Sequence, residues 1–69
     1  MQIGDLHYES NNRVATITLN RRDKFNTITE RMPGDLVEAV NRASDDDAVH
    51  IIVLTGAGRG FCGGYDLNQ

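Results

Sequence analysis

The chain has 69 residues and a formal net charge of −3, from seven Lys or Arg against ten Asp or Glu. A chain of this length forms at most one small domain. Its basic residues are scattered, which argues against nucleic acid as a partner, and the single cysteine, Cys62, cannot form an intramolecular disulfide. Without an apolar run near the roughly 18 residues of a membrane span, and without a signal-peptide pattern, we expect a soluble cytoplasmic protein with no membrane partner.

Two segments near the N-terminus have the composition of β-strands. Ile3–Glu9 and Val14–Leu19 are rich in apolar and β-branched residues, and the four residues between them are typical of a turn. The sequence therefore predicts a β-hairpin. One set of alternating side chains on its second strand is expected to face the core: Ala15, Ile17 and Leu19.

The next segment, residues 20–26, reads NRRDKFN. Charge runs usually form solvated loops, and composition alone favours that interpretation. The alternative is a cationic lip that holds an anionic ligand. In that case Arg21, Arg22 and Lys24 would contact phosphate, the arginines through a bidentate fork and the lysine as a point charge.

Thr29–Ala43 has the periodicity of an amphipathic helix, with Thr29 as a candidate N-cap. The predicted apolar stripe consists of Met32, Leu36, Val40 and Ala43. Because proline is best tolerated in the first helical turn, Pro33 indicates that the regular helix begins near it. The three aspartates at 45–47 lack the alternate spacing of a calcium loop, so we predict a solvated turn and no metal site.

The segment Ile51–Thr55 is a short apolar run, which is typical of a strand buried on both faces. Five glycines follow within residues 56–64. Such a density lets backbone N–H groups turn outward and lets a ligand approach the main chain. Asp66 lies three residues before Gln69, the spacing of a capping box, so we expect a helix to start there.

The glycine-rich segment supports two hypotheses. Residues 58–63 match the dinucleotide-binding pattern G-x-G-x-x-G, but in that fingerprint the helix starts within the motif, whereas here its first cap comes later. The second hypothesis is an oxyanion hole, in which a backbone N–H at a helix start stabilises negative charge on a carbonyl oxygen. The N–H placed for this role, just before Asp66, belongs to Tyr65.

Four sequence blocks in order resemble the crotonase superfamily, the enoyl-CoA hydratase/isomerase family. They are ITLNR at 17–21, Asn26, IVLTGAG at 52–58 and FCGGYDL at 61–67. The resemblance covers roughly residues 14–67. It implies a mixed α/β (α+β) fold, in which residues 1–69 form a crotonase-like ββα unit as the N-terminal part of a single, truncated domain of the ClpP/crotonase spiral fold.

The resemblance also implies a site. The backbone N–H of Tyr65 would be one of two oxyanion donors to the thioester carbonyl of an acyl-CoA. CoA would enter as part of the substrate, with no other cofactor, and the full-length protein would form a homo-oligomer. The residues that would bind the substrate are Arg22, Asp23, Lys24, Phe25, Cys62, Gly63 and Gly64.

The chain also departs from the family pattern. Arg22 stands where proline is usual, and Asn26-Thr27-Ile28 stands where Asn-Ala-Leu is common. The second oxyanion donor and the glutamates that serve as general acid and base in the hydratases belong to segments C-terminal to this chain. We therefore expect the isolated chain to be inactive. The alternative from another class is a non-catalytic remnant or interaction module.

Overall fold

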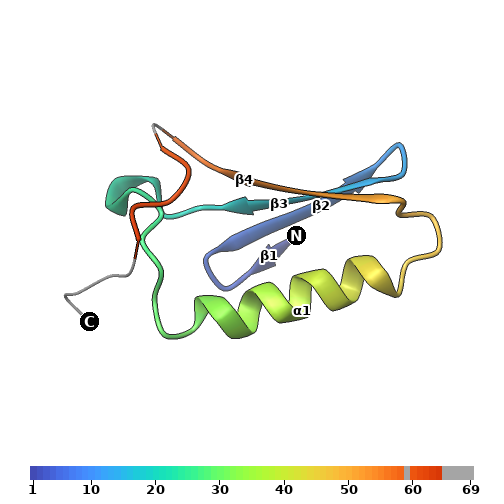
Figure 1. The fold of residues 1–69 in the computed structure, drawn as a ribbon, viewed down its shortest axis with the longest axis horizontal. Helices are drawn as coiled ribbons and strands as arrows, with labels where there is room; N and C mark the ends of the chain where they lie inside the picture. Colours follow the sequence, from blue (N-terminus) through green and yellow to red (C-terminus); the bar gives the residue numbers. More distant parts are fainter. Residues whose placement is uncertain (59, 65–69) are drawn as a thin grey trace.

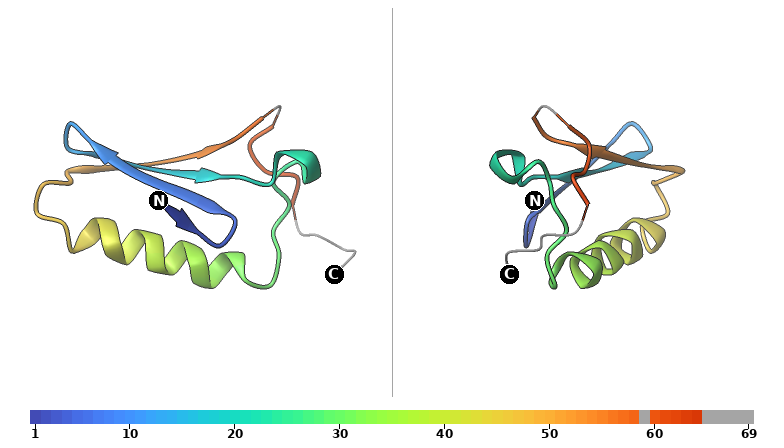
Figure 2. Two further views of the ribbon diagram at one scale, coloured as in Figure 1. Left: turned by 180° about the vertical axis from the view of Figure 1, so that it is seen from behind. Right: turned by 60° about the vertical axis from the view of Figure 1, so that its left-hand side comes forward.

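The computed structural model describes residues 1–58 and 60–64. It contains a four-stranded sheet in the order β1-β2-β3-β4, with one α-helix along one face (Figures 1 and 2). The elements are β1 (Gln2–Ile3), β2 (Leu6–Asn11), β3 (Val14–Leu19), the 3-10 helix η1 (Arg22–Lys24), α1 (Met32–Ser44) and β4 (Ile51–Gly56). The mixed α/β fold expected from the sequence is confirmed.

The predicted hairpin is present as the antiparallel pair β2–β3. Its turn is tighter than expected, because β2 continues to Asn11 and pairs there with Val14. The two residues of the turn, Asn12 and Arg13, have φ of 52° and 70°. Two consecutive positive φ values characterise the type I′ turn, whose twist matches that of the flanking strands.

The first predicted strand, Ile3–Glu9, is interrupted in the structure. Gly4 adopts φ of 56° in a turn that separates β1 from β2, and the two short strands then pair antiparallel. A positive φ is available to glycine without strain. The interruption folds residues 2–3 back beside the hairpin and adds one more strand to the sheet.

Strands β3 and β4 are parallel, with Val14 opposite Ile51 and Leu19 opposite Gly56. Because a parallel pair needs a long crossover connection, the chain between them forms α1 and crosses one face of the sheet. Figure 1 shows the result: the loops that follow β3 and β4 lie at the same end of the molecule, away from the β2–β3 turn.

The core lies between the sheet and α1. The predicted inner face of β3 is buried, as expected from its alternation. The helical stripe differs at one position, because Ala39 is fully buried whereas Val40 is 36% exposed. With Ala39 in place of Val40, the stripe that starts at Met32 has spacings of four, three and four residues. These spacings follow the 3.6-residue period of the helix more closely than those of the predicted stripe. The buried apolar residues are Ile3, Leu6, Tyr8, Ala15, Ile17, Leu19, Met32, Ala39 and Ala43.

The start of α1 confirms the effect of Pro33. The helix begins at Met32, with Pro33 within its first two positions and Arg31 as N-cap. Thr29 is not the cap. Its backbone N–H instead donates to the Met32 sulfur at 3.4 Å, in the loop before the helix.

The predicted strand at 51–55 is present as β4, but its predicted burial is wrong for the described residues. Ile51, Ile52, Val53 and Leu54 are 41–58% exposed, although consecutive residues point to opposite faces. The reason is position: β4 is at the edge of the sheet and pairs with β3 alone. Apolar side chains on both faces of this strand are therefore partly exposed.

Within the described residues, no helix is long and apolar enough to cross a membrane.

Two glycines, one inside α1 and one in the β1–β2 turn beside it, test the packing of α1. A Cβ added at Gly34, inside α1, would meet no atom within 4 Å. We expect Gly34→Ala to raise the free energy of unfolding by about 0.5–1 kcal/mol, through higher helix propensity and a less flexible unfolded chain. Gly4→Ala should instead lower the free energy of unfolding. Its Cβ would collide with Asp35 Oδ2, and alanine is strained at the positive φ of this position. Urea titrations followed by circular dichroism should move the two midpoints in opposite directions, and a shared direction would contradict this packing.

Candidate functional site

Two loops meet at the carboxyl ends of the parallel strands. The first, residues 20–31, follows β3 and contains η1; the second, residues 57–64, follows β4 and is called the glycine loop below. The carboxyl ends of parallel strands are where ligands commonly bind in α/β folds. Figure 1 shows η1 and the described part of the glycine loop side by side at this end.

The side chain of Asn26 joins the two loops. It is fully buried, and its amide nitrogen donates to the Ala57 carbonyl at 2.8 Å and to the Gly60 carbonyl at 2.9 Å. Its amide oxygen accepts the backbone N–H of Arg21 at 2.7 Å. Both amide hydrogens and one oxygen lone pair are thus used, as expected for a buried carboxamide.

Two backbone hydrogen bonds extend the same connection. The N–H of Ile28 donates to the carbonyl of Gly64 at 2.7 Å, and the N–H of Ala57 donates to the carbonyl of Leu19 at 2.8 Å. The glycine loop is therefore held at its beginning by the end of β3, in its middle by Asn26 and at its last described residue by Ile28.

Three glycines of this region are required by close packing within the protein. A Cβ at Gly56 would collide with the backbone of Phe61, and one at Gly58 would lie 2.7 Å from the Arg22 Cβ. A Cβ at Gly63 would lie 3.1 Å from the Thr27 methyl. The glycine density thus serves close packing within this region.

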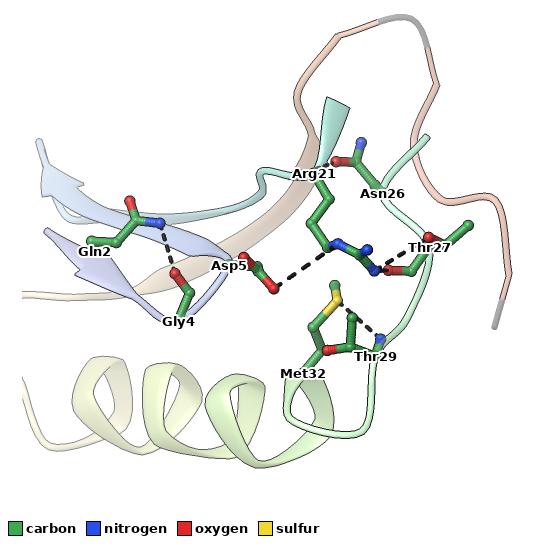
Figure 3. Close-up of polar contacts among 8 residues, drawn as sticks. All are labelled: Gln2, Gly4, Asp5, Arg21, Asn26, Thr27, Thr29 and Met32. Carbon is green, nitrogen blue, oxygen red and sulfur yellow. Dashed lines mark hydrogen bonds and ion pairs between the residues drawn. The ribbon is translucent and has the colours of Figure 1, made fainter. Parts of the chain in front are cut away.

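Arg21 does not belong to the predicted cationic lip. Its side chain is only 15% exposed, and its guanidinium donates to the Thr27 carbonyl at 2.7 Å and to Thr27 Oγ1 at 3.3 Å. Its Nε also lies 4.0 Å from Asp5 Oδ2. Figure 3 shows the guanidinium between Asp5 and Thr27. These contacts commit Arg21 to the interior, where it joins the β1–β2 turn to the loop after β3.

The other predicted residues of the first loop lie on its surface. Arg22, Asp23 and Lys24 form η1 and are exposed. Phe25 follows with φ of 53° and a side chain that is 58% exposed. Two cations and one aromatic ring therefore stand at the outer edge of the two joined loops, where a solvated ligand could reach them.

The predicted residues of the glycine loop divide between the interior and the surface. Cys62 is half-buried and faces an open apolar cavity of about 230 Å³ between the sheet and the start of α1. Gly63 packs against the first loop, and Gly64 has φ of 89° with open space where a Cβ would lie. The cavity is lined by Leu6, Leu19, Ile28, Met32, Pro33, Leu36, Leu54, Phe61 and Cys62.

Tyr65 and Asp66, the predicted oxyanion donor and helix cap, lie outside the described residues. Within residues 1–58 and 60–64, no three His, Cys, Asp or Glu side chains gather in a group able to hold a metal ion. Asn26 belongs to a sequence motif, but its role as a link between the two loops was not predicted from the sequence. A usable signal was its residue type, because asparagine tolerates the left-handed φ of 56° found here and can both donate and accept.

Solved structures share this fold. An enoyl-CoA hydratase from Mycobacterium smegmatis superposes with a TM-score of 0.92 at 44% identity, covering 96% of this chain and 23% of that one. An enoyl-CoA hydratase/isomerase from Mycobacterium paratuberculosis gives a TM-score of 0.89 at 40% identity, covering 97% and 26%. The fold is thus that of the crotonase-type enoyl-CoA hydratases.

Sequence comparison gives the same family. The 1,2-epoxyphenylacetyl-CoA isomerase of Escherichia coli is 46% identical over 56 residues, which are 81% of this chain and 21% of that protein. The enoyl-CoA hydratase/isomerase family model matches residues 9–69. The chain therefore belongs to the enoyl-CoA hydratase/isomerase family of the crotonase superfamily. It spans about a quarter or less of the length of these relatives.

Two glycines of the glycine loop provide a matched test of its packing. Gly58 has φ of 83° and no room for a Cβ beside Arg22, whereas a Cβ at Gly60 would meet nothing within 4 Å. We expect Gly58→Ala to lower the free energy of unfolding by about 1–3 kcal/mol and Gly60→Ala to change it by less than about 0.5 kcal/mol. Chemical denaturation of the two variants measures both values. Equal losses would show that the loop does not pack against Arg22.

Proposed function

We propose that this chain supplies the CoA-thioester-binding part of an enoyl-CoA hydratase/isomerase. The observation that carries the proposal is the glycine loop, held against the first loop by Asn26 in a chain that belongs to this family. A loop fixed in this way offers backbone N–H groups without the entropic cost of ordering them when the ligand binds. Residues 1–69 would then be the N-terminal part of one crotonase domain.

The surface of the two loops suits the chemical parts of an acyl-CoA. Arg22 and Lys24 are exposed cations that would contact phosphates, and the methylene stem of Lys24 and the ring of Phe25 would cover apolar parts of the ligand. Cys62, Gly63 and Gly64 would lie along the pantetheine, where small residues allow close approach of the main chain. Asp23 would stand beside the cations.

The catalytic contribution of the chain would be one hydrogen bond. The backbone N–H of Tyr65 would donate to the thioester carbonyl oxygen, and this bond would strengthen as negative charge develops on that oxygen in the enolate. The Tyr65 side chain has no part in this donation. Proton transfer and the second N–H donor would come from other segments of the complete enzyme, which would also form the homo-oligomer.

Calorimetric titration tests the binding part of this proposal. The chain should bind crotonyl-CoA, with affinity that falls as salt rises, because exposed cations are screened by ions. Arg22→Ala should weaken binding and reduce the salt dependence, since one phosphate contact is lost. Arg42→Ala is the control, because Arg42 is an exposed cation in the last turn of α1. Binding of NAD in place of crotonyl-CoA would favour the dinucleotide hypothesis and overturn the proposal.

The oxyanion donor requires a complete enzyme. We would replace the matching segment of the Mycobacterium smegmatis enoyl-CoA hydratase with residues 9–69 and follow loss of the enoyl-thioester absorbance. Tyr65→Pro, which removes the N–H, should lower kcat by about 10²–10³-fold, whereas Tyr65→Phe, which keeps it, should retain activity.

The 69-residue chain alone serves as the reference in this assay and should show no turnover, since it lacks the proposed acid, base and second donor. Turnover by the chain alone would mean that the chemistry has been misplaced. A Tyr65→Pro chimera as active as its Tyr65→Phe counterpart would remove Tyr65 from the oxyanion hole. A folded chimera that binds crotonyl-CoA without turnover would support the alternative of a non-catalytic module.

A further inference from the structure

Among the described residues, the carboxamide of Asn26 reaches two carbonyls of the glycine loop, on residues that lie 31 and 34 positions further along the chain. We propose that Asn26 is a positioning residue, which sets the path of the glycine loop and so the direction of its N–H groups. The inference rests on the proposed function and deepens it, because the glycine loop is the part of the chain proposed to bind the CoA thioester.

The geometry of the carboxamide explains how it acts. The two N–H bonds of Asn26 Nδ2 are fixed in one plane, so the two carbonyls that accept them, from Ala57 and Gly60, are held at a fixed separation. In a planar trans peptide the C=O of one residue points opposite to the N–H of the next. Holding these carbonyls toward Asn26 therefore turns the N–H groups of Gly58 and Phe61 away from it.

The backbone of Asn26 is itself fixed. Its N–H donates to the Arg21 carbonyl at 2.8 Å while its side-chain oxygen accepts the Arg21 N–H at 2.7 Å. The residue thus closes its own loop before it reaches the glycine loop, and its left-handed φ of 56° aims the side chain from that closed turn. Aspartate has the same shape without the two donors, and glutamine would move the amide outward by one methylene.

Amide exchange on the isotope-labelled 69-residue chain separates positioning from general stability. The Ile28 N–H reports on the glycine loop, because it donates to Gly64, and the Tyr8 N–H reports on the sheet, because it donates to Met1. In Asn26→Asp we expect about tenfold faster exchange at Ile28 and unchanged exchange at Tyr8. The Arg21 N–H should stay protected, because its acceptor oxygen is retained.

Asn26→Gly is a second variant, needed because the buried carboxylate of Asn26→Asp could unfold the chain. Glycine accepts the positive φ without strain and introduces no charge. It should accelerate exchange at both Ile28 and Arg21 and again leave Tyr8 unchanged. Thr27→Val is the matched control: it removes the 3.3 Å contact from Arg21 to Thr27 Oγ1 but keeps a similar shape, so exchange at Ile28 should stay as in the parent.

Crotonyl-CoA titration adds a functional readout. Asn26→Asp and Asn26→Gly should each weaken binding about tenfold relative to Thr27→Val. Equal acceleration at Ile28 and Tyr8 in both Asn26 variants would reduce Asn26 to a general stability role, and no acceleration at Ile28 would show that the loop does not depend on it; either result overturns the inference. If the parent chain binds no crotonyl-CoA, the proposed function fails while the exchange data still decide the role of Asn26.

Discussion

The arrangement of the two loops depends on the buried carboxamide of Asn26. Loops at the end of a parallel strand pair have no regular backbone ladder between them, yet their buried carbonyls still need donors. Asn26 supplies two donors from one side chain, to Ala57 and Gly60. A hydrogen bond of this kind adds about 1 kcal/mol, but leaving a buried carbonyl unpaired costs about 1–3 kcal/mol, so losing the donor has the larger effect.

The glycines complete what Asn26 begins. With the two loops joined by the carboxamide, a Cβ at Gly58 would collide with the Arg22 Cβ, and a Cβ at Gly63 would be in tight contact with the Thr27 methyl. Gly60 and Gly64, by contrast, have open space on the side where a Cβ would lie. The same run of glycines therefore packs closely at some positions and leaves space beside the main chain at others, which suits a binding surface made of backbone.

The edge strand β4 shows a different relation between pattern and environment. Its unbroken apolar run is typical of a strand covered on both faces, whereas each of its four apolar residues is at least 41% exposed. The open cavity beside Leu54, Phe61 and Cys62 has the same apolar character. The apolar composition of β4 and of the cavity lining is typical of covered surfaces, whereas among the described residues these surfaces are partly exposed. The chain covers 21–26% of the relatives compared above.

The sequence by itself determined the hairpin, the bounds of β3 and its inner face, the helix with its start near Pro33, and the family, because alternation, helical period and motif order are local properties of the chain. Only the tertiary structure decided that Arg21 turns inward to Asp5 and Thr27, that Ala39 replaces Val40 in the core, and that Asn26 joins two loops. Those outcomes depend on contacts between residues far apart in the sequence, such as the hydrogen bond from Asn26 to Gly60 across 34 positions. No local spacing records such a contact, because it exists only after the parallel pairing of β3 and β4 has brought the two loops to one end of the sheet.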